Sequence, residues 1–271
     1  SEDWIIDLDI HAFFDSLDHG LMMKAVRHHT TRSWIPLYVE RWLTAPLQGE
    51  DGTLVDRTCG SPQGSAISPL LANLFMHYAF DAWMAREFPD VRFERYCDDV
   101  VVHCTSQSQA HHLLQAITER LACCGLEVNQ EKTRIVYCKD DRRRGRHDHT
   151  RFDFLGYTFC PRRCKGGRSG EYFTGFNPAI SDQARRRIGQ EIRHWHLSRS
   201  NDQSLADLAR GTNVVVQGWI TYYGRYFPSR LHTVLRRINT HLVRWSQRKY
   251  RRLKRDHPRG KRGPAGVGGR E

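Results

Sequence analysis

Two adjacent acidic residues in front of an apolar run constrain this chain more than any other feature. The tetrapeptide Tyr96-Cys97-Asp98-Asp99 leads directly into three valines, Val100–Val102. β-branched residues favour strands, and the residues just before the acids alternate as a strand does. The pattern therefore predicts a β-hairpin whose turn carries two carboxylates.

The two neighbouring anions need a neutralising partner, because they repel each other and resist burial beside an apolar strand. A divalent cation can supply the charge. Mg²⁺ prefers oxygen ligands and uses one or two carboxylates together with substrate phosphates. The pair therefore indicates a metal site for phosphoryl transfer, unless it is only a solvated turn.

A second acidic segment lies at the N-terminus. Apolar side chains occupy every second position of residues 4–10, and Asp7 and Asp9 fall between them on the other face. The alternation predicts a half-buried strand that presents acids, but it does not say which acid is a ligand, since both point the same way. A third carboxylate from this strand would complete a two-metal site for an in-line displacement.

Five motifs follow one another in a specific order, and a sixth segment lies further on. The five lie at residues 9–19, 60–73, 96–99, 125–133 and 152–157, and the sixth lies at Val216–Gly224. The first three resemble reverse-transcriptase palm motifs, and the next two resemble those of the bacterial group II intron type. The last segment is similar to the maturase region of intron-encoded proteins.

This resemblance implies an α+β fold, in which a right-hand polymerase palm with an antiparallel sheet and packed helices spans residues 1–177. An α-helical thumb or maturase domain would follow at 178–248, where apolar residues recur at helical spacing and favour three helices. A basic tail at 249–271 is predicted to be disordered without RNA. The aromatic residues near the end of the second helix fit either helix packing or base stacking.

The resemblance also implies a metal site. Asp9, Asp98 and Asp99 match the three carboxylates with which the family holds two Mg²⁺ ions, so that Asp9 rather than Asp7 is the implied third ligand. Cys97 departs from the family, which most often has a residue such as alanine there. Because cysteine is also small and apolar, the turn should tolerate it. All three carboxylates are present, which argues against a polymerase-dead maturase.

Other matched positions imply contacts with substrate. Phe14 matches an aromatic under the incoming sugar, whose bulk would collide with a ribose 2′-hydroxyl and favour deoxynucleotides, although it could also be a core residue. Ile10 is implied to lie at the same substrate site. Gln63 and Gly64 match a turn that positions nucleotide and template. Lys132 matches a lysine near the leaving pyrophosphate, where a cation stabilises charge or donates a proton.

The charge is polarised along the chain. Residues 1–140 carry 12 Lys and Arg against 20 Asp and Glu, and residues 141–271 carry 30 against 10. A half built around metal-binding acids and a half that neutralises phosphates suit a template-primer polymerase with salt-sensitive binding. The distribution therefore predicts a nucleic-acid partner.

The implied activity is that of an RNA-directed DNA polymerase, a nucleotidyltransferase that adds deoxynucleotides to a DNA primer on an RNA template. A group II intron would encode it, with maturase and retromobility roles, and the intron RNA would be a partner. Two alternatives stay open. The chain could be a non-catalytic RNA-binding splicing cofactor, or a bacterial reverse transcriptase outside introns.

The chain opens directly on the first acidic strand, whereas the family places a fingers region before it. We therefore expect either a fragment or a protein that needs a fingers segment or partner chain, and weak activity for this chain alone. No run of about 18 apolar residues and no signal peptide occurs, so the sequence predicts no membrane insertion and a cytoplasmic location. Eight cysteines without an obvious disulfide framework favour a reducing compartment.

Overall fold

The chain folds into two units, residues 1–177 and 178–271. Their structure is a computed structural model that describes residues 2–49, 51–62, 64–143, 145–167, 170–250 and 253. The basic tail expected at 249–271 therefore lies almost wholly outside the described residues.

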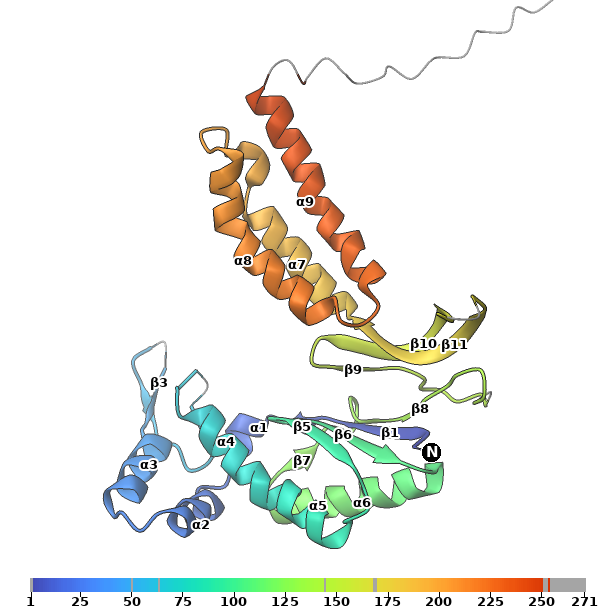
Figure 1. Ribbon diagram of the computed structural model, residues 1–271. Coiled ribbons are helices and arrows are strands. Elements are labelled where there is room, and N and C mark those ends of the chain that lie inside the picture. Colours follow the sequence, from blue (N-terminus) through green and yellow to red (C-terminus); the bar gives the residue numbers. More distant parts are fainter. Residues whose placement is uncertain are drawn as a thin grey trace, which may run out of the picture. The chain divides into compact units, whose positions relative to one another are not determined.

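The first unit is built on a four-stranded antiparallel sheet (Figure 1). Its strands, in spatial order, are β5 (Phe93–Tyr96), β6 (Asp99–Cys104), β1 (Trp4–Leu8) and β8 (Arg134–Tyr137). β5 and β6 form the predicted hairpin, with Cys97 and Asp98 in its turn. β1 pairs with β6 so that Leu8 lies opposite Val100. The N-terminal acidic strand therefore runs beside the acidic hairpin.

α6 (Gln107–Cys123) packs against one face of this sheet and against the π-helix η1 (His77–Asp81). α4 (Ser68–Met76) precedes η1 and α5 (Ala82–Glu87) follows it, while α2 (His19–His29) packs against α3 (Trp34–Thr44) and α4. Ile6 and Val102 of the sheet share one buried cluster with Ile117 of α6 and Phe80 of η1. α4, η1 and α5 follow one another without a break, so they form one helix that contains a π turn.

A second sheet packs on the other face. It consists of β11 (Tyr172–Ile180), β10 (Tyr157–Lys165) and β9 (Phe152–Phe154), in that spatial order. Phe152 joins Ile5, Val101 and Val136 in a separate buried cluster. The alternation of β1 thus serves two cores, one for each face of the strand.

The predicted N-terminal strand is shorter than expected. It stops at Leu8. Strand pairing resumes in β2 (Ile10–His11), which pairs with β7 (Glu127–Val128). Ala12 then adopts a left-handed conformation with φ 43°, which turns the chain into the short helix α1 (Phe13–Ser16). Phe13 and Phe14 therefore lie on a helix and not on a strand. A small hairpin of β3 (Leu47–Gln48) and β4 (Leu54–Val55) follows α3.

The second unit contains the three predicted helices, α7 (Asp182–His194), α8 (Leu205–Tyr223) and α9 (Pro228–Lys249), with a 3₁₀ turn η2 (Leu197–Arg199). Serine side chains cap α7 and α8, and α9 begins with a proline, as expected for helix starts. Ile188 and Ile192 of α7 pack against Leu231 and Val234 of α9. The α+β fold class predicted from the sequence is confirmed.

The aromatic residues at and just after the end of α8 differ in their surroundings. Trp219 stacks on Trp195 with ring centroids 5.4 Å apart, whereas Tyr222 and Tyr226 are 47% and 44% exposed. In the described part of the chain, no helix is both long enough and apolar enough to cross a membrane.

Candidate active site

Asp9 lies in the break between β1 and β2, where a single loop holds its backbone. Its N–H donates to Thr133 Oγ1 at 3.2 Å, and its carbonyl accepts from the Asn129 N–H at 2.9 Å. Lys132 Nζ lies 3.3 Å from Asp9 Oδ2. Because Asn129, Lys132 and Thr133 belong to the loop between β7 and β8, this loop both fixes Asp9 and supplies a cation to its carboxylate.

Strand pairing brings Asp99 to Asp9. Leu8 lies opposite Val100, so one further step along the antiparallel ladder sets Asp9 opposite Asp99. Burial raises the pKa of Asp99, the negative charges of Asp98 and Asp9 raise it further, and Lys132 lowers it. Asp99 therefore lies close enough to Asp98 and to Asp9 to be repelled by both, with Lys132 as a nearby positive charge.

The chemistry of these side chains fits a divalent cation. Carboxylate oxygens are the ligands that Mg²⁺ prefers, and mutual repulsion among anions is what a cation relieves. As they stand, no three His, Cys, Asp or Glu side chains among the described residues are arranged to hold a metal ion. A cation would have to draw Asp9, Asp98 and Asp99 closer together, in competition with Lys132.

Asp7 lies on the same strand face as Asp9 but occupies a different environment. It pairs with Val101 on β6 and with Arg134 on β8, on the side of the sheet that the second sheet covers. Burial raises the pKa of Asp7 to about 7, with Asp99, Asp153 and Asp9 acting in the same direction and Arg134 against it. The alternation could not separate Asp7 from Asp9, but strand pairing does, because only Asp9 lies at the end of the ladder beside the turn.

Phe14 is joined to the motif that begins at Gly60. The Phe14 carbonyl accepts from the Ser61 N–H at 2.6 Å, and its half-buried ring meets Phe13 edge to face at 5.3 Å. Gly60 has φ 81°, and a Cβ there would lie 2.8 Å from the Asp15 carbonyl oxygen and 2.9 Å from that of Phe14. Glycine is therefore required at this close approach, which sequence reasoning missed.

The other residues expected at the substrate site lie in different environments. Gln63 lies outside the described residues. Gly64 is exposed with φ 85°, so glycine suits its left-handed backbone. Ile10 is only 4% exposed and packs in the main core. Because its side chain faces inward, only the backbone of Ile10 is available to a substrate, and its place at the substrate site stays a prediction.

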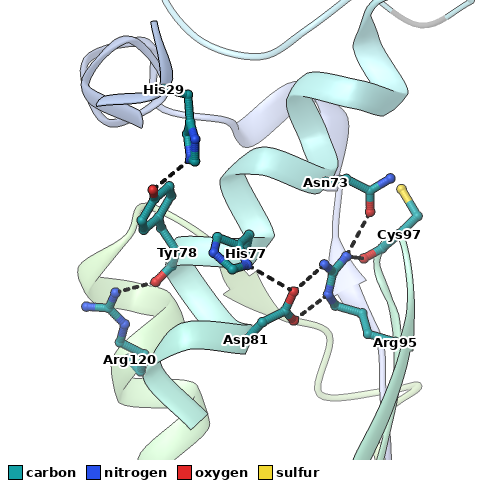
Figure 2. Close-up of polar contacts among 8 residues, drawn as sticks. All are labelled: His29, Asn73, His77, Tyr78, Asp81, Arg95, Cys97 and Arg120. Carbon is teal, nitrogen blue, oxygen red and sulfur yellow. Dashed lines mark hydrogen bonds and ion pairs between the residues drawn. The ribbon is translucent and has the colours of Figure 1, made fainter. Parts of the chain in front are cut away.

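Arg95 is a further residue at the site that sequence reasoning missed. Its side chain reaches from β5 to the carbonyl of Cys97 in the acidic turn, and also to Asn73 of α4 and Asp81 of η1 (Figure 2). The alternation of residues before the acids places Arg95 on a strand. No local pattern, however, connects it with Asn73 or Asp81 on the preceding helix. The close contacts of the turn therefore emerge only from the folded chain.

An antiparallel sheet with helices on one face and acids at the ends of its central strands defines the palm of a nucleic-acid polymerase. The model of the reverse transcriptase (RNA-dependent DNA polymerase) family matches residues 1–159, and that of the group II intron maturase-specific domain matches residues 185–263. The chain belongs to the reverse transcriptase family, and it is of the group II intron reverse transcriptase/maturase type. The resemblance recognised in the sequence motifs is confirmed.

Individual proteins similar to this chain share only part of its sequence with it. Protein YkfC of Escherichia coli K12 is 26% identical over 203 residues, which cover 60% of this chain and 49% of that protein. The COX1/OXI3 intron 1 protein of Saccharomyces cerevisiae is 33% identical over 81 residues, 30% of this chain and 10% of that protein. The structure of telomerase from Candida albicans with a fragment of telomeric RNA is 13% identical, with a TM-score of 0.47 over 91% of this chain and 44% of that chain. The chain thus spans about half or less of the curated relatives that it matches.

Proposed function

We propose that this chain is an RNA-directed DNA polymerase that adds deoxynucleotides to a primer 3′-hydroxyl. The observation that carries the proposal is that strand pairing sets Asp9, at the end of β1, opposite Asp99 of the acidic hairpin, beside Lys132. Membership of the reverse transcriptase family supports the reaction class.

Asp9, Asp98 and Asp99 would hold two Mg²⁺ ions. When bound, such ions activate the attacking hydroxyl and stabilise the charge on the leaving oxygens. The chain itself contributes the position of the carboxylates: Thr133 and Asn129 fix the Asp9 backbone, and the β5–β6 turn fixes the other two acids. The family's use of divalent metal ions supports this assignment.

Lys132 would change partners during the reaction. Its side chain is 67% exposed and pairs with Asp9, so it can leave that carboxylate when a metal ion takes it. A lysine ammonium then stabilises the negative charge of the departing pyrophosphate and can donate a proton to it. Lys132 thus acts on the leaving group, while the carboxylates act on the reacting centre.

The substrate side would be formed by Phe14 and the segment bonded to it. The half-buried ring of Phe14 would lie under the incoming sugar and exclude a ribose 2′-hydroxyl. Gln63 and Gly64 would contact nucleotide and template. The hydrogen bond between Phe14 and Ser61 supports this proposal, because it ties the two parts of the substrate site together.

The RNA partners follow from the second half of the chain. We assign residues 178–248 as the thumb and maturase domain, which would bind the template–primer duplex and group II intron RNA and so serve splicing and retromobility. The match to the maturase-specific domain and the excess of basic residues after 140 support this assignment. A cytoplasmic location would suit these partners.

The maturase-specific domain also favours a second candidate, a splicing cofactor that binds intron RNA without catalysis. The two candidates differ in what the acids do. In the cofactor, the carboxylates near Asp98 would only shape the palm, and their removal would leave splicing unchanged.

Primer extension tests the proposal. The purified chain is incubated with an RNA template, a DNA primer, deoxynucleotides and Mg²⁺, and compared with Asp98→Asn and with the exposed control Asp90→Asn. We expect weak but measurable extension by the wild type and Asp90→Asn, and a loss of about 100-fold or more in Asp98→Asn, since electrostatic stabilisation of the transition state is removed. Equal rates for all three would contradict the proposal, and absent extension with splicing unaffected by Asp98→Asn would favour the cofactor.

A further inference from the structure

The acidic turn is tied to the helix that contains the π turn. Arg95 Nε and Nη2 donate to the two carboxylate oxygens of Asp81 at 2.7 and 2.6 Å (Figure 2). The Arg95 side chain is 11% exposed and that of Asp81 is 25% exposed. A bidentate pair of this kind fixes orientation as well as distance, because two parallel hydrogen bonds leave the guanidinium no freedom to rotate.

The third nitrogen of Arg95 points at the turn itself. Nη1 donates to the Cys97 carbonyl and to Asn73 Oδ1, each at 2.9 Å. Cys97 adopts φ 59°, a left-handed conformation that non-glycine residues rarely adopt and that persists only where the surroundings impose it. Arg95 therefore holds the carbonyl of the residue with a left-handed backbone that immediately precedes Asp98.

The π turn brings the two helix partners of Arg95 into line. Each residue of an α-helix turns by about 100°, so residues eight apart diverge by about 80°, whereas residues seven apart diverge by only about 20°. Asn73 and Asp81 are eight apart, but η1 takes up one extra residue between them. The two side chains therefore face the same side of the helix, toward Arg95.

A second arginine supports the π turn from another side. Arg120 of α6 donates to the carbonyls of Tyr78 and Ala79 at 3.0 Å each. His77 Nδ1 lies 3.9 Å from the carboxylate of Asp81 (Figure 2). Arg120 thus contacts the same π turn as Arg95 does, but it does not contact the acidic turn. Its replacement is therefore a matched control for loss of helix stability.

We propose that Arg95, with Asp81 and Asn73, is a positioning residue that sets the acidic turn for metal binding. The inference rests on the proposed function of Asp98 and Asp99. A buried ion pair is weak evidence for stability, and in some proteins such pairs instead fix one geometry. Here the fixed geometry is that of the backbone immediately before the two carboxylates.

Metal binding by the full chain tests this role independently of polymerase activity. Mn²⁺ binding is measured by electron paramagnetic resonance, and amide hydrogen exchange is measured in the β5–β6 hairpin. Arg95→Lys keeps the positive charge but cannot hold Asp81 by two bonds and the Cys97 carbonyl at once. We expect its Mn²⁺ dissociation constant to rise by about 10- to 100-fold, as when groups that orient metal ligands are removed, and exchange in the hairpin to accelerate.

Two milder variants and one control complete the experiment. Asp81→Asn and Asn73→Ala remove one partner each and should shift Mn²⁺ binding in the same direction, which keeps the test valid if Arg95→Lys folds poorly. Arg120→Ala should lower the melting temperature while Mn²⁺ affinity and hairpin exchange stay at wild-type values.

The outcomes separate the two proposals. Wild-type Mn²⁺ affinity in folded Arg95→Lys and Asp81→Asn, with binding lost in Asp98→Asn, would overturn the positioning role and leave the metal site intact. Equal Mn²⁺ binding by wild type and Asp98→Asn would instead overturn the proposed metal site, and the role of Arg95 with it. An equal effect of Arg120→Ala on Mn²⁺ affinity would reduce Arg95 to a structural residue.

Discussion

The ammonium of Lys132 lies 3.3 Å from the carboxylate of Asp9, although 123 residues separate the two in sequence. The pair is solvent-exposed on the lysine side, so it adds only about 0 to 1 kcal/mol to stability. Its position favours a use in the reaction instead, since it places an exposed cation beside the carboxylate proposed to bind metal.

Replacement of Lys132 tests this use. We expect Lys132→Ala to change the free energy of unfolding by less than about 0.5 kcal/mol and to slow nucleotide addition by about 100-fold or more. Single-turnover primer extension measures the rate, and urea unfolding measures stability. Lys24→Ala, an exposed lysine on α2, is the control. A wild-type rate in Lys132→Ala would rule out a role at the leaving group.

Gly60 and Gly64 form a matched pair for backbone strain. Both have positive φ, but a Cβ at Gly60 would meet backbone atoms of Phe14 and Asp15, whereas a Cβ at Gly64 has nothing within 4 Å. We expect Gly64→Ala to cost about 1 kcal/mol of stability and Gly60→Ala to cost about 2 to 3 kcal/mol. Urea unfolding of both variants checks the difference, and equal losses would show that the close approach is relieved at no cost.

Asp7 should make stability depend on pH in metal-free protein. Its pKa is raised from 3.8 to about 7, so the folded state binds this proton more tightly than the unfolded state does. Stability therefore falls as pH rises from about 4 to about 7, and Asp7→Asn should remove the fall. Above pH 7 the variant should be more stable than wild type by up to about 4 kcal/mol. Urea unfolding in EDTA, with Asp90→Asn as control, measures the effect, and parallel pH curves for wild type and Asp7→Asn would refute it.

Phe14 should determine the choice of sugar. Phe14→Val removes ring bulk at the proposed nucleotide site, so ribonucleotide incorporation relative to deoxynucleotide incorporation should rise by about 10- to 100-fold. The ratio of kcat/KM values for the two nucleotides measures it. Phe13→Leu, a change in the buried neighbour, should lower stability and leave the ratio unchanged. A shift in both variants would mean that the core, and not the ring of Phe14, sets the preference.

Local patterns predicted the elements that carry the acids. The valines after Asp99 and the alternation around Asp7 are signals within a few residues, and both strands are present. The convergence of Asp9 with Asp99 depends instead on the pairing of β1 with β6, about 90 residues apart, and was anticipated only through the resemblance to a family.

Other features had no local signal. The contact of Arg95 with Asp81 depends on a π turn, and that turn depends on packing around η1 that no periodicity of the sequence reveals. The division of the first strand at Asp9 was also missed, because the alternation of residues 4–10 continues through the break. The inward side chain of Ile10 follows from that alternation, yet the resemblance suggested a substrate contact there.

The loop between β7 and β8 grips the Asp9 backbone at both its N–H and its carbonyl and also carries Lys132. The loop therefore both holds Asp9 and places Lys132. What links these two functions is the number of residues between Asn129 and Thr133, more than their identity. Other residue types could replace Gln130 and Glu131. Adding or removing a single residue, however, would displace both the groups that hold the Asp9 backbone and the ammonium of Lys132. The length of this loop, more than its composition, thus keeps the Asp9 carboxylate next to the Lys132 ammonium.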